Sequence, residues 1–265
     1  MELSPVVVAV GLVAAFVLGV SKTSVPSVGA FGVALLATVV PALESTGVAL
    51  PVLLLGDLFA IALYARHADV RLLVRLLPGV TVGLVAGYLV VRHLDAAVVT
   101  RLIGAILLLS VVGALARRTR TSRRPHTSHA GGADAGQALE PEPARPGAAT
   151  PVSLLLGAGA GLSTMVANAG GPMMTLYLLR MRVGTLAFLG TVAWFFFAVN
   201  LLKLPFSIGL GLIDAESLRL SAAIAPGIVA GALVGRRLVA GMSRQVFERL
   251  ALAATGAAGL WLLIR

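Results

Sequence analysis

Cysteine is absent from this chain of 265 residues, and charged and aromatic side chains are scarce, at 12% and 5% of the residues. Without cysteine there is no disulfide framework and no thiolate metal site. The four histidines do not have the spacing of metal ligands on a helix, which argues against a metalloenzyme. Because 58% of the residues are hydrophobic, too little polar surface is left for a water-soluble domain of this size. We expect an all-α integral membrane protein that is not an enzyme and has no cofactor.

Apolar segments divide the chain into two halves of similar organisation. Two segments, 30–40 and 172–179, are too short to cross the hydrocarbon core and are predicted to be half-helices. The fold prediction is therefore about eight full transmembrane helices among up to ten segments. The segments are residues 4–20, 30–40, 46–64, 76–91 and 98–116 in the first half, and 151–167, 172–179, 183–202, 218–234 and 246–264 in the second.

A polar stretch separates the halves. Residues 117–150 are first rich in arginine and then in proline, glycine, alanine and acidic residues, without apolar periodicity. Such a composition cannot bury enough apolar surface to fold. We predict a disordered cytoplasmic linker over 117–150, between a first transmembrane repeat at 1–116 and a second at 151–265.

The two halves resemble each other in sequence. Five residues of the first half recur in the second at a constant offset of 148, which indicates homologous repeats: Pro78, Gly79, Gly83, Gly87 and Arg101 match Pro226, Gly227, Gly231, Gly235 and Arg249. If the arginine-rich linker is cytoplasmic, the other basic loops fall inside and both termini outside. Each half then crosses the membrane an odd number of times, so the repeats have inverted topology.

A polar, helix-breaking segment occurs once in each half, within apolar sequence. Paired breaks of this kind mark the substrate site in many secondary transporters. Hydroxyls, amides, backbone N–H groups and one cation could hold an oxyanion there. The alternative for the Ser21 and Ser163 hydroxyls is a hydrogen bond to a carbonyl of their own helix. The candidate binding residues are Ser21, Lys22, Thr23 and Ser24 in the first break and Ser163, Thr164, Asn168, Gly170 and Gly171 in the second.

Two charged residues lie within apolar sequence and need partners. Lys22 is either a surface orientation charge or the counter-charge of a bound anion, and Asp57 either pairs with Lys22 or takes up a proton during transport. Asn200 occupies the repeat position of Asp57, and both join the candidate substrate-binding residues. Lys203 is expected at the membrane interface, because Pro205 should end its helix soon after. A direct role in substrate binding is the alternative for Lys203.

Several motifs carry a resemblance to a known family. Gly19-Val-Ser-Lys-Thr-Ser-Val-Pro26, Gly56-Asp-Leu-Phe-Ala60, Ala167-Asn-Ala-Gly-Gly-Pro172 and Trp194-Phe-Phe-Phe197 are similar to segments of the TauE/SafE sulfite exporters. The resemblance covers nearly the whole chain apart from the linker. It implies a small two-repeat transporter of sulfite, sulfonates or other sulfur-containing anions. In the first motif, residues 22–26 replace most of the glycine cluster that is more usual in the family.

The function prediction is a secondary transporter, working as an exporter, that moves a sulfur oxyanion across the cytoplasmic membrane by alternating access. An anion channel, a permease for a carboxylate or another non-sulfur anion, and a non-transport scaffold are the alternatives. The expected partners are a small anion and membrane lipid, without nucleic acid. Proton coupling through Asp57 and the oligomeric state stay open.

Overall fold

Every regular element in the part of the chain that the structure describes is a helix. The computed structural model describes residues 4–24, 26–122, 151–181 and 183–241, with residues 253, 256, 257, 260, 263 and 264. The predicted segment 246–264 lies mainly outside these residues. The helices are α1 (Pro5–Thr23), η1 (Pro26–Val28), α2 (Gly29–Leu36), α3 (Ala42–Tyr64), η2 (Ala65–His67), α4 (Val70–His93), α5 (Ala96–Ser122), α6 (Pro151–Ala167), α7 (Gly171–Arg180), α8 (Thr185–Gly209) and α9 (Ala215–Gly241).

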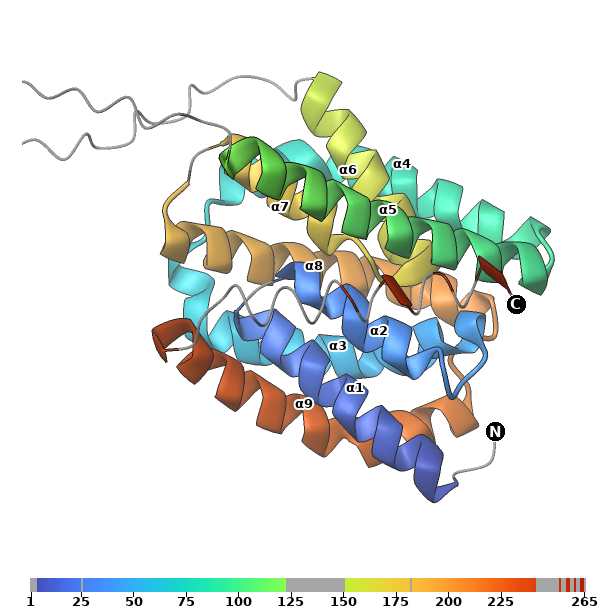
Figure 1. Cartoon of the computed structure of the whole chain (residues 1–265). Helices are drawn as coiled ribbons and strands as arrows, with labels where there is room; N and C mark the ends of the chain where they lie inside the picture. Colours follow the sequence, from blue (N-terminus) through green and yellow to red (C-terminus); the bar gives the residue numbers. More distant parts are fainter. Residues whose placement is uncertain are drawn as a thin grey trace, which may run out of the picture.

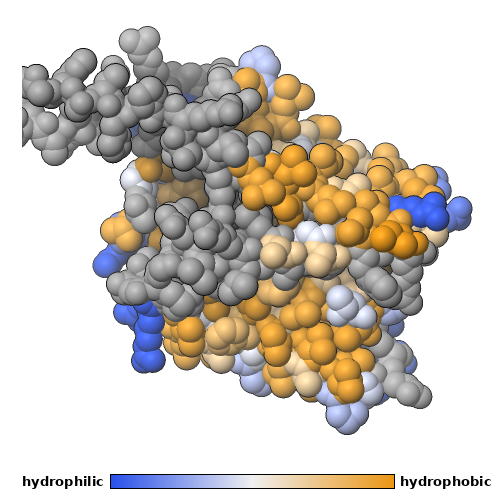
Figure 2. All heavy atoms as spheres, viewed as in Figure 1, coloured by the Kyte–Doolittle hydropathy of each residue, from blue (hydrophilic) through white to orange (hydrophobic). Residues whose placement is uncertain are grey.

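Apolar side chains cover much of the outside of the molecule as well as its core. Figure 2 shows hydrophobic residues spread over the viewed face. Among the described residues, α1, α3, α4, α8 and α9 are long and apolar enough to cross a membrane. Exposed apolar residues occur on most of the helices, for example Val13, Val82, Leu109, Leu155 and Leu233. Surfaces of this kind suit contact with lipid rather than water, so the chain is an all-helical, multi-pass membrane protein.

The two predicted half-helices are present and short. α2 has 8 residues and α7 has 10, lengths of about 12 Å and 15 Å. The hydrocarbon core is about 30 Å thick, so neither helix can cross it alone. Each follows a break after a longer helix, α1 in one half and α6 in the other.

Several helices extend beyond the predicted segments, and two of these extensions bear on an expectation from the sequence. α5 continues to Ser122, so residues 117–122, which we assigned to the disordered linker, are helical. α8 continues through Pro205 to Gly209, so the expectation that Pro205 ends this helix is wrong. Proline is tolerated inside membrane helices because neighbouring groups satisfy the freed carbonyl.

Helices of the first half pack against helices of the second. Figure 1 shows α1 beside α9, α3 beside α8, and α4 beside α6. Equivalent glycine contacts occur in two of these pairs, α1 with α9 and α6 with α4. A Cβ on Gly19 would overlap the backbone of Ile228 and Ala232, and one on Gly161 would overlap the backbone of Val80 and Leu84. Glycine therefore lets α1 approach α9, and α6 approach α4, backbone to backbone.

Candidate functional site

Both helix breaks line the same cavity. Most of its lining residues belong to the first break, the second break or one side of α8. The lining residues are Leu18, Ser21, Lys22, Pro26, Gly29, Ala30, Leu53, Thr164, Asn168, Gly171, Val192, Phe196 and Asn200. Of the eleven residues predicted for the site, six line this cavity: Ser21, Lys22, Thr164, Asn168, Gly171 and Asn200.

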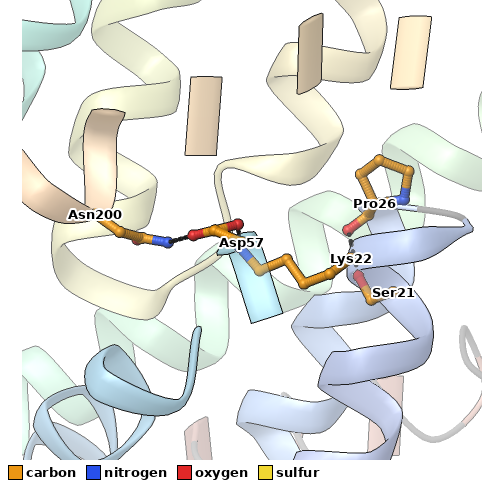
Figure 3. A network of polar contacts seen from close by, with 5 residues as sticks. All are labelled: Ser21, Lys22, Pro26, Asp57 and Asn200. Carbon is orange, nitrogen blue, oxygen red and sulfur yellow. Dashed lines mark hydrogen bonds and ion pairs between the residues drawn. The ribbon is translucent and has the colours of Figure 1, made fainter. Parts of the chain in front are cut away.

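A polar chain of three side chains runs from the first break into the core. Lys22 Nζ lies 2.6 Å from Asp57 Oδ1, and Asn200 Nδ2 donates a hydrogen bond of 2.6 Å to Asp57 Oδ2. Figure 3 shows Asp57 between the other two. The Lys22 side chain is 8% exposed and that of Asp57 is 0% exposed. The expected ion pair is therefore present, and Lys22 is not a surface orientation charge.

An aromatic ring completes the surroundings of Lys22. Its ammonium lies 4.6 Å from the ring centroid of Phe196, a cation–π geometry. Phe196 packs edge-on against Phe195, with ring centroids 5.2 Å apart. Phe196 thus forms a wall of the cavity, whereas Trp194, two residues earlier, is partly exposed.

The second lysine is also buried, which the sequence analysis did not predict. Lys203 is 0% exposed and donates to the Thr164 carbonyl at 2.9 Å and to Asn168 Oδ1. Its expected interfacial position is wrong because α8 continues past Pro205, which leaves Lys203 inside the bundle. Within the described ranges it has no carboxylate partner. It therefore holds the end of α6 at the second break.

Asn168 shapes that break through its backbone and its side chain. Its φ is +49°, a left-handed conformation that asparagine adopts more readily than most residues. This conformation ends α6. The side chain accepts from Lys203 and donates to the Thr46 carbonyl at 3.3 Å, so it connects α6 to α8 and α3.

The N-termini of α2 and α7 both lie at the cavity, through Gly29 and Gly171. The first N–H groups of a helix have no partner within it, and the helix dipole favours negative charge there. The Ser21 hydroxyl donates 3.2 Å to the Pro26 carbonyl and remains able to accept. The Lys22 ammonium and helix N-terminal N–H groups are donors of the kind that suits an anion.

Five predicted residues lie outside the cavity lining. The hydroxyls of Thr23, Ser24 and Ser163 donate to carbonyls four residues earlier in their helices. For Ser163 this was the predicted alternative. Gly170 packs closely against α6, since a Cβ there would lie 3.1 Å from the Ala160 carbonyl. Asp57 contacts the cavity only through Lys22 and Asn200.

Seven lining residues were not among the predicted binding residues: Leu18, Pro26, Gly29, Ala30, Leu53, Val192 and Phe196. Gly29 occupies the repeat position of Gly171, at an offset of 142, so the repeat contained a signal for it. Pro26 belonged to the breaking motif. Phe196 could not be identified from the sequence, because the sequence does not indicate which face of α8 lines the cavity.

Lys22 and Lys203 are the only lysines in the chain, and their burial can be measured. We expect their ε-amines to react with an amine-reactive ester at least about tenfold more slowly in the native detergent-solubilised protein than in the unfolded protein, because neither ammonium meets solvent freely. Mass spectrometry of peptides after timed labelling gives both rates, and unfolded protein is the control. Rapid labelling of Lys203 in native protein would contradict its position in the core.

A multi-pass helical bundle with two broken helices around one polar cavity has the architecture of secondary transporters. Comparison with protein families agrees with this class. Residues 7–262 match the model of the family described as Sulfite exporter TauE/SafE. Neither a search of curated proteins nor a search of solved structures finds a match. Since the family match spans nearly the whole chain, the chain belongs to the TauE/SafE family.

Proposed function

We propose that the chain is a secondary transporter that exports a small sulfur oxyanion, such as sulfite or a short sulfonate, across the cytoplasmic membrane. The observation that carries the proposal is the cavity at which Lys22, Ser21 and the N-termini of α2 and α7 meet. A cation and backbone N–H groups at a helix N-terminus are donors that an oxyanion needs in a low-dielectric core. The Ser21 hydroxyl joins them only when it turns away from the Pro26 carbonyl, to which it donates in the empty site. The family supports sulfur as the central atom.

Binding of the anion involves an exchange of partners at Lys22. Without substrate, the ammonium is neutralised by Asp57 at 2.6 Å. An anion that enters beside Lys22 competes with this carboxylate for the same charge. Asp57 then keeps its hydrogen bond from Asn200. The ion pair therefore neutralises Lys22 in the empty site and sets the affinity for the anion.

Movement across the membrane follows from two inverted repeats, 1–116 and 151–265, joined by a cytoplasmic linker at 117–150. Support comes from the matched sequence positions and from the paired contacts of Gly19 with α9 and Gly161 with α4. Rocking of one repeat against the other around a fixed site gives alternating access. A cell interior that is negative favours export of anions, by roughly 2.3 kcal/mol per charge for 100 mV.

Asp57→Asn tests the exchange. The variant leaves Lys22 without its carboxylate, so we expect a lower melting temperature without ligand and a larger stabilisation by sulfite than in the wild type, with affinity raised about tenfold or more. Thermal shift and calorimetric titration measure both effects. Asp95→Asn makes the same chemical change at an exposed position and serves as the control. A smaller stabilisation in Asp57→Asn than in the wild type would show that Asp57 helps to hold the anion.

The same ligand series separates the alternatives. Sulfate, thiosulfate, sulfoacetate, taurine, phosphate and simple carboxylates are compared with sulfite. Preference for a carboxylate would favour a permease for non-sulfur anions, and no binding at all would favour a scaffold. In proteoliposomes, a transporter shows saturable flux and counterflow, whereas a channel shows neither.

The orientation predicts where the linker lies. A single cysteine introduced at Gly132, in this cysteine-free chain, is expected to resist an impermeant maleimide in intact cells and to react after the cells are opened. A cysteine introduced at Asp95, in a loop proposed to lie outside, is the matched control and should react in intact cells. Labelling of the first variant from outside would reverse the proposed orientation.

A further inference from the structure

One polar atom at the cavity is left without a partner. Asn200 is 1% exposed and lines the cavity, and its Oδ1 accepts no hydrogen bond from the residues that the structure describes. A buried acceptor without a donor is costly. Its partner is therefore expected to be a group that enters the site.

The chemistry of Asp57 fixes which atom of the Asn200 amide is unpartnered. The atom that faces Asp57 Oδ2 at 2.6 Å must be a donor, because a carboxylate paired with a lysine only accepts hydrogen bonds. That atom is the amide nitrogen. Exchanging the two amide atoms would place an oxygen against a carboxylate oxygen. The free atom of Asn200 is thus its carbonyl oxygen, an acceptor.

The charges of the core favour a ligand with a single negative charge. Among the described buried residues are two lysines, Lys22 and Lys203, and one carboxylate, Asp57. With both lysines protonated, a monoanion balances this set, whereas a dianion leaves an excess negative charge in a low-dielectric region. The charges therefore favour a monoanion, and the free acceptor of Asn200 favours a ligand that carries a hydrogen-bond donor.

We propose that the bound species is a monoanion that carries one hydrogen-bond donor. Asn200 Oδ1 accepts from this donor, and Lys22 binds the negative charge. This proposal rests on the proposed function. Hydrogen sulfite, with one protonated oxygen, has this composition, and sulfite and sulfate dianions do not. A proton that moves with the substrate then travels on the anion itself. Asp57 remains an ionised acceptor for Asn200 throughout.

The proposal can be tested by calorimetric titration of three ligands into the full-length protein between pH 6 and pH 9, without oxygen. The three ligands differ in charge and in whether they carry a hydrogen-bond donor. Total sulfite converts from monoanion to dianion within this range, methanesulfonate stays a monoanion without a donor, and sulfate stays a dianion. We expect sulfite affinity to fall about tenfold per pH unit once the dianion dominates. Methanesulfonate and sulfate should bind at least about tenfold more weakly than sulfite at pH 6, without this pH dependence.

Other outcomes overturn the proposal in distinguishable ways. A pH dependence for methanesulfonate equal to that for sulfite would place the proton on the protein, with Asp57 as the first candidate. Equal affinity for sulfite and sulfate at pH 6 would show that neither the donor nor the single charge matters. Either result overturns this inference alone, whereas the absence of binding by all three anions overturns the proposed function as well.

Asn200→Leu provides a second test that does not depend on the titration of sulfite. Leucine has a similar volume and no acceptor, so the preference for sulfite over methanesulfonate at pH 6 should fall from at least about tenfold to less than about threefold. The ratio of affinities is insensitive to a general loss of stability. An unchanged ratio would contradict the role of Asn200. If the variant does not fold, the three-ligand series on the wild type decides.

Discussion

Lys22→Met is expected to abolish anion binding and to destabilise the empty protein. Methionine matches the length of lysine without its charge, so Asp57, which is 0% exposed, would be left as a buried carboxylate with only Asn200 as partner. Removing one member of a buried ion pair costs about 3–5 kcal/mol. The affinity for sulfite should fall by about 100-fold or more, because the ligand loses its cation. Thermal unfolding and calorimetric titration measure the two effects separately.

A double variant distinguishes the structural role of Lys22 from its binding role. In Lys22→Met with Asp57→Asn, neither charge of the ion pair remains and Lys203 is unchanged, so stability should return to within about 1 kcal/mol of the wild type. Binding should stay absent. Restored binding in the double variant would show that the anion does not depend on Lys22, and a stable single variant would show that the ion pair is not buried.

Gly19→Ala is expected to have the second large effect. A Cβ at this position overlaps the backbone of Ile228 and Ala232 on α9, and backbone atoms cannot move aside as a side chain can. We expect a loss of about 3 kcal/mol, at the upper end of the range for overpacking. Gly161→Ala meets the equivalent backbone of α4 and should cost a similar amount. Thermal unfolding in detergent measures both losses.

The control for the glycine variants is Gly113→Ala. Gly113 lies within α5, and a Cβ there meets nothing within 4 Å. Alanine should therefore leave stability unchanged or raise it by up to about 1 kcal/mol, through its better helix propensity. If Gly19→Ala behaved like this control, α1 and α9 could not approach as closely as the structure has them. A large loss at Gly19 with none at Gly161 would count against equivalent repeats.

Much of the helical fold could be predicted from the sequence because its signals are local. A run of apolar residues predicts a helix, and the polar, proline-containing segment at 21–26 predicts a break. The boundaries were less predictable. Pro205 would end a helix in water, but α8 continues past it, because neighbours in a packed bundle can satisfy the carbonyl that proline leaves free.

The candidate site could be predicted only in part because it depends on helix rotation. Lys22 and Asp57 were recognisable, since an isolated charge in apolar sequence requires a partner. The Ser24 hydroxyl donates to the Val20 carbonyl, whereas Ser21 lines the cavity. This difference could not be predicted, because both serines lie in the same polar segment. Nor did the sequence indicate that Phe196, and not Trp194, faces Lys22.

The two halves share packing positions but differ in charge. Lys22 occupies the repeat position of Thr164, and Asp57 that of Asn200. The first half therefore contributes the ion pair, whereas the second contributes Lys203 and its two neutral acceptors. The buried charges are therefore distributed unequally between the two halves.

The most direct test of an anion site at the paired breaks is a structure with a heavy analogue of the ligand. Selenite is the selenium counterpart of sulfite, and its position can be found from anomalous scattering. We predict one strong anomalous peak in the cavity, beside Gly171 at the start of α7, with a selenite oxygen within hydrogen-bond distance of Lys22 Nζ. A cavity without selenium, with peaks only at arginines on the surface, would contradict the account.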